Sequence, residues 1–243
     1  MKAVLRWLLL VLAAFVALQL FFVLRIAAMA VVAPESTSFQ RSEAWRIFGE
    51  KHRLPWRQQW VPYEQISDNL KRAVIASEDG SFVNHDGIDW DSLEKAWLRN
   101  AKAEEMYAKR AALAPARARA PKVVGGSTIT QQLAKNLLLS GERSLLRKGQ
   151  EFVLTMALEH TLSKQRILEI YLNSVEWGDG VFGAEAAAQH YFRKSASRLS
   201  PYEAARLAVM LPQPKRFEKM PGSGYLAGRT STIVARMRDA ELP

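Results

Sequence analysis

The chain has 243 residues, of which 49% are hydrophobic, and a formal net charge of +10. It contains no cysteine, which excludes disulfides, thiolate metal sites and a cysteine nucleophile. A chain of this length has room for one good-sized core and for no second large domain. The positive charge favours an anionic partner, such as nucleic acid, phospholipid head groups or a phosphorylated substrate.

Residues 1–33 are predicted to form a cytoplasmic stub and a transmembrane anchor. From Trp7 to Leu24 the only polar residue is Gln19, and this run makes about 27 Å of helix against a hydrocarbon core of roughly 30 Å. Lys2 and Arg6 precede the span, so the positive-inside rule sends the rest of the chain across the membrane. This placement argues against nucleic acid as a partner. A cleaved signal peptide is the alternative, because Ala28-Met29-Ala30 matches a cleavage site.

Residues 34–61 are predicted to form a linker and a membrane-proximal segment. The linker is the polar stretch from Pro34 to Phe39. Aromatic and basic side chains follow it, and they fit either a wet interface with lipid head groups or an aromatic corner of the core. These side chains are Trp45, Phe48, Trp56, Trp60, Tyr63, Lys51, Arg53 and Arg57.

The stretch from Ala76 to Gly87 carries the expected general base. A run that reads as an apolar helix ends at Ser77-Glu78-Asp79, and the chain then turns through Gly80. A carboxylate held against apolar side chains loses solvation, which raises its pKa towards the range that proton abstraction requires. We therefore expect Glu78 to act as a base, although this stretch alone also fits a helix that ends in a solvated Glu-Asp pair.

A basic segment follows. The pattern from Asp89 to about Ala112 predicts a helix, and the stretch from Arg99 to Lys122 contains seven basic and two acidic residues. Its part from Ala114 to Lys122 is expected to be a mobile basic loop. Such a loop fits a solvated surface, and it also fits contact with anionic lipid or with a phosphate-bearing substrate.

The most specific stretch runs from Gly125 to Asn136 and reads GGSTITQQLAKN. The two glycines let the backbone approach a ligand closely, and Ser127 or Thr128 can cap the helix that follows. Apolar residues at i, i+4 and i+8 predict one buried stripe, and an anionic group suits the helix N-terminus. The stripe is Ile129, Leu133 and Leu137, and the polar face is Thr128, Gln131, Gln132, Lys135 and Asn136.

The pattern from Arg147 to Glu159 predicts the next helix. Arg147 and Glu151 are four residues apart, so they share a face. This pair fits a surface ion pair, and it also fits a cation that faces a phosphate and is oriented by a carboxylate. In the last third, Ser163 and Ser200 are predicted helix caps. Asn173 and Glu176 are expected to cap the core, and contact with the substrate is the alternative.

Five motifs in order carry a resemblance. The chain resembles the peptidoglycan glycosyltransferases, which are lysozyme-like polymerases of lipid II, and among them the monofunctional biosynthetic peptidoglycan transglycosylases. Agreement of five ordered motifs is far less expected by chance than any single short match. The motifs are Glu78-Asp79 with Phe82, His85 and Gly87; GGSTITQQLAKN; Arg147-Lys148 with Glu151; ILEIYLN at Ile167 to Asn173; and GDGVFGAEAAAQHYF at Gly178 to Phe192.

The resemblance implies a mainly α, two-lobed, lysozyme-like glycosyltransferase domain over residues 62–243. It also implies a single-pass protein of the bacterial inner membrane, with this domain on the periplasmic side. The implied reaction is inverting transfer from a polyprenyl-diphosphate-linked donor to the 4-hydroxyl of an acceptor sugar, so lipid II and the growing glycan strand are the substrates. The basic segment from Arg99 to Lys122 is longer than in the family, and no family role transfers to it.

By the same resemblance, Glu78 corresponds to the base. Glu151 is the second catalytic residue and lies in the group around the donor diphosphate, together with Lys135, Arg147 and Lys148. The remaining motif residues are expected to bind substrate. They are Asp79, Phe82, His85, Ser127, Thr128, Gln131, Gln132 and Asn136.

The leaving group sets the expected cofactor. A diphosphate needs cations or a divalent metal such as Mg²⁺, bound mainly through the diphosphate itself, rather than a proton donor. No protein-ligated metal is expected, because the four histidines show no ligand spacing. The lipid bilayer and other cell-wall synthesis or division proteins are the further expected partners.

Two other functions fit parts of the sequence. A lysozyme-like lytic enzyme that cleaves glycan strands would need an acid to protonate a sugar leaving group. A non-catalytic membrane scaffold for cell-wall synthesis would not need Glu78 at all.

Overall fold

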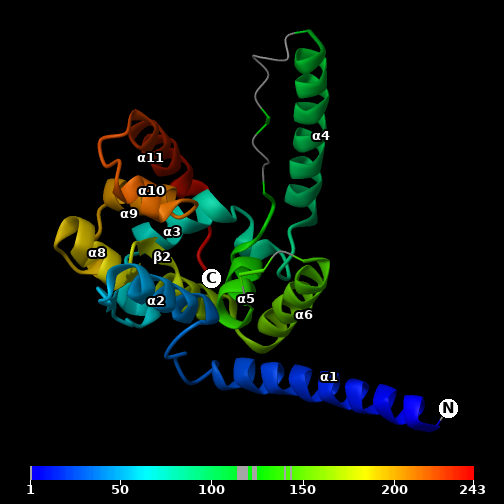
Figure 1. Ribbon diagram of the computed structural model, residues 1–243. Coiled ribbons are helices and arrows are strands. Elements are labelled where there is room, and N and C mark those ends of the chain that lie inside the picture. The colour runs from blue at the N-terminus through cyan, green and yellow to red at the C-terminus, as the bar shows by residue number, and fades with distance from the viewer. Residues whose placement is uncertain (1, 114–119, 122–124, 140, 143) are drawn as a thin grey trace.

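The computed structural model describes residues 2–113, 120–121, 125–139, 141–142 and 144–243 (Figure 1). Most of the predicted basic loop, residues 114–119 and 122, therefore lies outside the described residues. Helices dominate, so the predicted mainly α class is confirmed. They are α1 (Lys2–Ala28), α2 (Ser38–Lys51), α3 (Asp68–Glu78), α4 (Trp90–Leu113), α5 (Ile129–Leu138), α6 (Leu145–Thr161), α7 (Lys164–Ser174), α8 (Ala184–Phe192), α9 (Pro201–Met210), α10 (Pro214–Glu218) and α11 (Gly224–Arg236).

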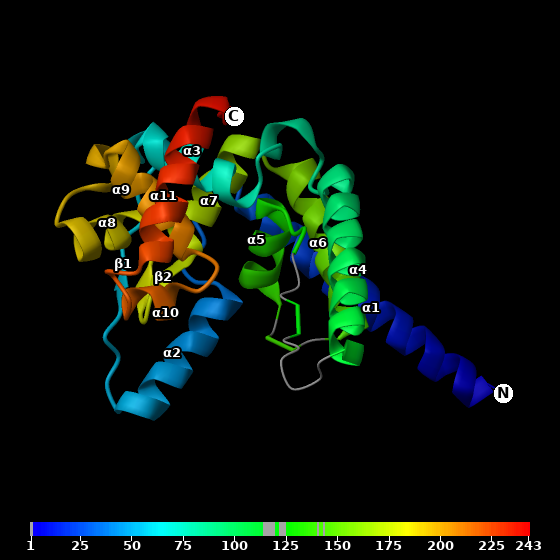
Figure 2. The same ribbon diagram turned by 90° about the horizontal axis from the view of Figure 1, so that it is seen from above.

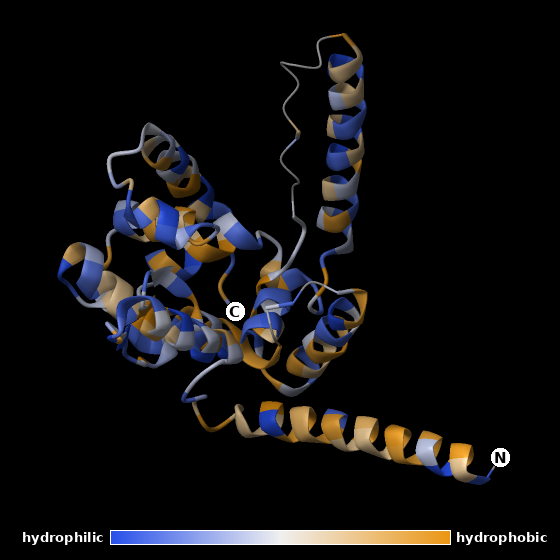
Figure 3. Cartoon of the chain, viewed as in Figure 1, coloured by the Kyte–Doolittle hydropathy of each residue, from blue (hydrophilic) through white to orange (hydrophobic). Residues whose placement is uncertain are grey.

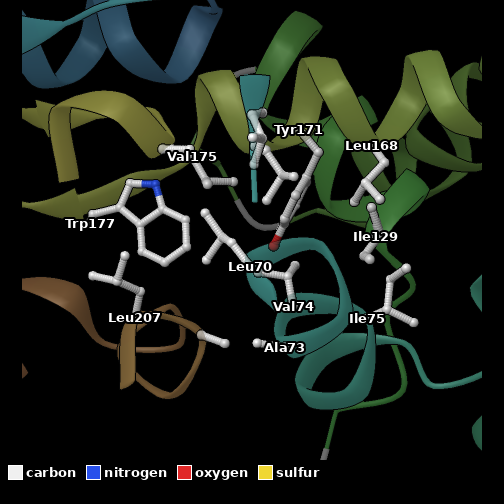
Figure 4. Close-up of a cluster of buried hydrophobic side chains, with 14 of the residues drawn as sticks. Leu70, Ala73, Val74, Ile75, Ile129, Leu168, Tyr171, Val175, Trp177 and Leu207 are labelled. Carbon is white, nitrogen blue, oxygen red and sulfur yellow. The ribbon is translucent and has the colours of Figure 1, made fainter. Parts of the chain in front are cut away.

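The helices form two groups around a shared core. In one group α3 packs against α9 and α11, and in the other α5 packs against α6 and α7. Helix α4 projects from the body on one side and α1 extends away from it on another (Figures 1 and 2). Buried side chains of α3, α5 and α7 meet between the groups, among them Leu70, Val74, Ile129, Leu168 and Tyr171 (Figure 4).

The starts of α3 and α5 are set by local sequence. Ser67 caps α3, and Thr128 forms a capping box with Gln131 at the start of α5. The predicted caps at Thr128, Ser163 and Ser200 are confirmed. The predicted stripe of α5 is also confirmed, since its three apolar side chains are at most 1% exposed. A stripe that is buried along its whole length holds the polar face of α5 in one orientation.

Helix α2 corrects the predicted linker. Thr37 caps this helix through a capping box with Gln40, so Ser38 and Phe39 belong to α2 rather than to a linker. The Gln40 side chain also donates to the carbonyl of Ser174 at 3.3 Å. The linker is therefore shorter than predicted, and the membrane-proximal segment packs onto the domain.

A small sheet holds the aromatic residues that follow α2. Its strands are β1 (Arg57–Gln58), β2 (Glu176–Gly178) and β3 (Val181–Phe182), in the order β1-β3-β2. Strand β1 is parallel to β3, whereas β2 is antiparallel to it. Trp56 stacks on Phe182 with ring centroids 4.4 Å apart, whereas Trp45 is 77% exposed. The core-corner interpretation therefore holds for Trp56 and not for Trp45.

Helix α1 is the one helix of the described chain that is long and apolar enough to cross a membrane. Most of it is surrounded by no other part of the protein, and its colouring is apolar almost throughout (Figure 3). Its C-terminal end is different, because Ile26 is 0% and the following Met29 is 3% exposed. The helix therefore ends in the core of the domain.

Candidate active site

Glu78 lies at the C-terminal end of α3, half-buried against the core. Its Oε2 accepts a hydrogen bond from Gln132 Nε2 at 3.1 Å, and Ser77 Oγ donates to its Oε1 at 3.4 Å. Burial raises the pKa of Glu78, and the hydrogen bonds from Gln132 and Ser77 oppose this shift only in part. A raised pKa is the shift that favours a carboxyl group as a general base.

A second hydrogen bond fixes Gln132. The hydroxyl of Tyr171 on α7 donates to Gln132 Oε1 at 3.0 Å, so the amide nitrogen of Gln132 must face Glu78. Tyr171 is 1% exposed, and burial raises its pKa well above the usual value, which keeps the hydroxyl a donor. Three motifs far apart in the sequence therefore meet in one chain of hydrogen bonds.

Asp79 and His85 join the first motif to the second. Asp79 Oδ1 lies 2.9 Å from His85 Nε2, and Oδ2 accepts from the backbone amide of Ile129 at 2.9 Å. The amide of Gly87 donates to His85 Nδ1 at 3.1 Å, so the proton of this ring lies on Nε2. Both side chains were predicted to bind substrate, but their polar atoms bond within the protein and hold α5 against the end of α3.

Phe82 and Thr128, which were predicted to bind substrate, are both buried, although Thr128 lines the cavity beside Glu78. Phe82 is 0% exposed and lies beneath Lys164, whose Nζ is 4.6 Å from the ring centroid. Thr128 is 2% exposed, and its hydroxyl donates to the carbonyl of Gly87 at 2.7 Å. Gly87 has a φ of +87°, and a Cβ there would lie 2.7 Å from Thr155 Cγ2, so this turn requires glycine. These contacts within the protein shape the site, and a direct contact of Phe82 or Thr128 with substrate stays a prediction.

Two cavities lie near Glu78, and the larger, here called the larger cleft, has a volume of about 900 Å³. The polar face of α5 reaches it through Gln132, Lys135 and Asn136, as predicted. Gln131 instead accepts from the amide of Thr128 at 3.2 Å in the cap of α5 and does not line this cleft. Arg147 of α6 lines the cleft, so Lys135 and Arg147 supply it with positive charge.

Glu151 holds the cations of α6. It is 4% exposed, its Oε2 lies 3.3 Å from Arg147 Nη1, and its Oε1 pairs with Lys148 Nζ. The buried Nε of Arg147 has no hydrogen-bond partner within the described chain. The Lys148 side chain is 53% exposed and does not line the larger cleft. Arg147 is therefore the member of this group that is placed to meet an anion.

Glu78 lines a smaller cavity of about 340 Å³ on its other side. The exposed Ser127 and the glycines before it line this cavity, together with Lys95 and Arg99 of α4 and Arg236 of α11. Glu78 lines the small cavity and its hydrogen-bond partner Gln132 lines the large one, so this pair connects the walls of the two cavities. Two cavities joined through the hydrogen bond of a candidate base suit a reaction between two substrates.

Comparison with known proteins agrees with this geometry. Residues 48–238 match the family model described as "Transglycosylase". The chain belongs to the transglycosylase family. The match begins within α2, ahead of the predicted domain boundary at Pro62. It includes all lining residues of the smaller cavity, and those of the larger cleft except Ser38, Phe39, Arg41 and Ser42.

Similar proteins of the family are named "Biosynthetic peptidoglycan transglycosylase". One from Burkholderia thailandensis is 54% identical over 95% of this chain and 84% of its own length. One from Paraburkholderia xenovorans is 53% identical over 95% of this chain and 89% of its own length. One from Herminiimonas arsenicoxydans is 51% identical over 100% of this chain and 99% of its own length.

Asn173 and Glu176, for which the sequence favoured core capping over substrate contact, differ in this transglycosylase. Asn173 caps the core as predicted, since its side chain bonds to both the amide and the carbonyl of Val61 at 2.9 and 3.0 Å. Glu176 instead lines the larger cleft, and its Oε1 lies 3.2 Å from Lys215 Nζ. Burial raises the pKa of Glu176 to about 7, although Lys215 opposes the shift. The cleft position therefore favours the alternative that the sequence left open for Glu176, because a single Glu on a short strand leaves no periodic signal that would decide between the two roles.

Glu176 belongs to a charged group that includes Glu43 and Arg46 of α2. Its carboxylate, with those of Glu43 and Asp179, has ligand atoms within 4.8 Å of one another. Arg46 bonds to both Glu43 and Asp179, and Lys215 pairs with Glu43 and Glu176. Protein cations therefore already neutralise these carboxylates, and the group ties α2 to the wall of the cleft.

Glu176→Gln should change how stability depends on pH. The pKa of Glu176 is about 7 in the folded chain against 4.5 for an ordinary glutamate, so the folded state binds more protons between these values. The stability that this group contributes therefore falls as the pH rises from about 4.5 to about 7. From about pH 5 to about pH 8, the free energy of unfolding of the variant should rise relative to that of the wild type by up to about 3 kcal/mol. Urea unfolding of both proteins at the two pH values measures this change. The same free-energy difference between variant and wild type at both pH values would contradict the prediction.

Proposed function

We propose that this transglycosylase polymerises lipid II into the linear glycan strands of peptidoglycan. The 4-hydroxyl of the acceptor sugar attacks the anomeric carbon of the donor, and the bond to the lipid diphosphate breaks with inversion. Glu78 accepts the proton of the attacking hydroxyl. The observation that carries this proposal is the position of Glu78, which is desolvated, lines one cavity and is hydrogen-bonded to Gln132 of a second cavity that Lys135 and Arg147 line.

The cations of the larger cleft suit the leaving group. A departing diphosphate gains negative charge, and fixed cations stabilise that charge without supplying a proton. Arg147 brings a guanidinium with a buried, unpaired Nε, and Glu151 holds it in place. A divalent cation such as Mg²⁺ would bind mainly through the diphosphate, because Glu151 already pairs with two protein cations. The donor therefore fits the larger cleft, and the acceptor fits the smaller one.

Helix α1 is proposed to remain attached as a single-pass anchor. Its 27 residues span about 40 Å, enough to cross a bilayer. Cleavage after Ala30 would remove Ile26 and Met29, which are buried in the core of the domain. With Lys2 and Arg6 on the cytoplasmic side, the catalytic domain lies on the periplasmic side of the inner membrane. An anchored enzyme meets a lipid-linked substrate that does not leave the bilayer.

Lipid II turnover by the full-length protein in liposomes tests this function. Glycan strands longer than a disaccharide, with no new reducing ends from preformed peptidoglycan, are expected. Shortening of preformed strands without polymerisation would favour the lytic enzyme, with Glu176 as the first acid to examine. No reaction with either substrate would favour the membrane scaffold. Gel separation of labelled glycans distinguishes these three results.

A further inference from the structure

Gln19 is the single polar side chain between Trp7 and Leu24, and it has a partner in the catalytic domain. Its Nε2 donates to Gln150 Oε1 at 3.1 Å, and Gln150 Nε2 donates back to Gln19 Oε1 at 2.9 Å. An amide in hydrocarbon is costly when it is unpaired. The reciprocal pair removes this cost for both side chains at once.

The contact continues beyond the amide pair. Helix α1 packs along α6, and Phe22 is partly buried against the core. Further on, Arg166 Nε donates to the carbonyl of Met29 at 2.7 Å. Before Gln19 the side chains of α1 are exposed. The helix is therefore docked along its last third and free along the rest.

The docked surface lies on the helix that carries the cations of the cleft. Gln150 is three residues after Arg147 and immediately before Glu151, so it lies one turn from Arg147 on α6. Leu146, Phe152 and Val153 of the same helix are 89%, 44% and 49% exposed. Gln19 lies six residues before Arg25, which places the pair about 9 Å along α1 from the basic end of the span.

We propose that α1 is a packed part of the catalytic domain, in which the Gln19–Gln150 pair fixes the rotation and depth of the span against α6. Gln19 and Gln150 are positioning residues: they hold Arg147 and Glu151 at the level of the lipid head groups, where the diphosphate of a membrane-bound substrate lies. The docking is independent of the reaction, whereas the positioning role rests on the proposed function.

Crosslinking tests the docking, because the chain contains no cysteine of its own. Full-length Gln19→Cys/Gln150→Cys protein in liposomes is treated with a short bis-thiosulfonate, whose spacer fills the gap left by the two amides. Ala17→Cys/Gln150→Cys is the matched control, since Ala17 is exposed at nearly the same depth and about 200° around α1. We expect the first pair to link at least about tenfold faster than the control. Equal rates for the two pairs would overturn the docking.

The same protein tests the positioning role. Reduction cleaves the crosslink, so the KM for lipid II can be compared in the linked and unlinked states of one preparation. We expect the unlinked protein, which lacks both amides, to show a several-fold higher KM with little change in kcat, and crosslinking to restore the wild-type KM. A crosslink that forms but leaves KM unchanged would overturn the positioning role. A wild type that polymerises no lipid II would count against the proposed function, while the linking rates would still decide the docking.

Discussion

Replacement of Glu78 by glutamine should lower the rate of glycan polymerisation by about 10²- to 10⁴-fold, the usual contribution of a general base. Glutamine keeps the shape and the contacts with Gln132 and Ser77 but cannot accept the proton. Because burial raises the pKa of Glu78, the charged carboxylate is costly in the folded protein above this pKa, and the neutral glutamine is not. The variant should therefore unfold at the same or a higher temperature near pH 8, so misfolding would not explain its inactivity.

The dependence of the wild-type rate on pH follows from the same shift. Activity should rise with pH through the raised pKa of Glu78, because only the deprotonated carboxylate accepts a proton. Tyr171→Phe removes the hydroxyl that orients Gln132, and Gln132 lowers the pKa of Glu78. This variant should lose about tenfold in kcat/KM and shift the acidic limb to higher pH. Wild-type activity in Glu78→Gln, or an unshifted limb in Tyr171→Phe, would contradict these roles.

Local signals in the sequence predicted much of the fold. The start of α5 follows from its capping threonine, and its orientation follows from Ile129, Leu133 and Leu137, which recur at helical spacing. Helix α2 has no such pattern, because polar and apolar residues are mixed around its whole surface. The three strands have two or three residues each, too few for an alternating pattern to appear.

The site shows the limit of reasoning from motifs. Glu78 was predicted from its surroundings, but its partner Gln132 lies 54 residues away, and Tyr171 lies 39 residues beyond that. Only tertiary packing brings the three together. Membership of a motif also did not separate residues that face the cleft from residues that support it. Phe82 and Gln131 are of the second kind, because Phe82 is 0% exposed and Gln131 bonds to the cap of α5.

Replacement of Glu151 by glutamine should lower kcat/KM by about 10²-fold or more through the loss of a fixed cation. Glu151 is buried and pairs with both Arg147 and Lys148, so its carboxylate determines where the Arg147 guanidinium points in the cleft. Stability should fall by only about 1–2 kcal/mol, since both cations retain some access to water and can be solvated again. Steady-state kinetics with lipid II and urea unfolding measure the two effects separately.

Two matched variants decide whether the loss reflects position rather than charge. Glu105→Gln removes a carboxylate from the Glu105–Lys109 pair of α4, whose side chains are 63% and 67% exposed. It should change neither kcat/KM nor the free energy of unfolding. Lys148→Gln removes a cation that does not line the cleft, so it should cost far less activity than Arg147→Gln. If Lys148→Gln and Arg147→Gln were equally damaging, net charge on α6 would explain the effect and the assignment of Arg147 to the diphosphate would be wrong. If Arg147→Gln and Glu151→Gln lose a similar, large part of kcat/KM and Lys148→Gln does not, the buried carboxylate of Glu151 acts by orienting the Arg147 guanidinium.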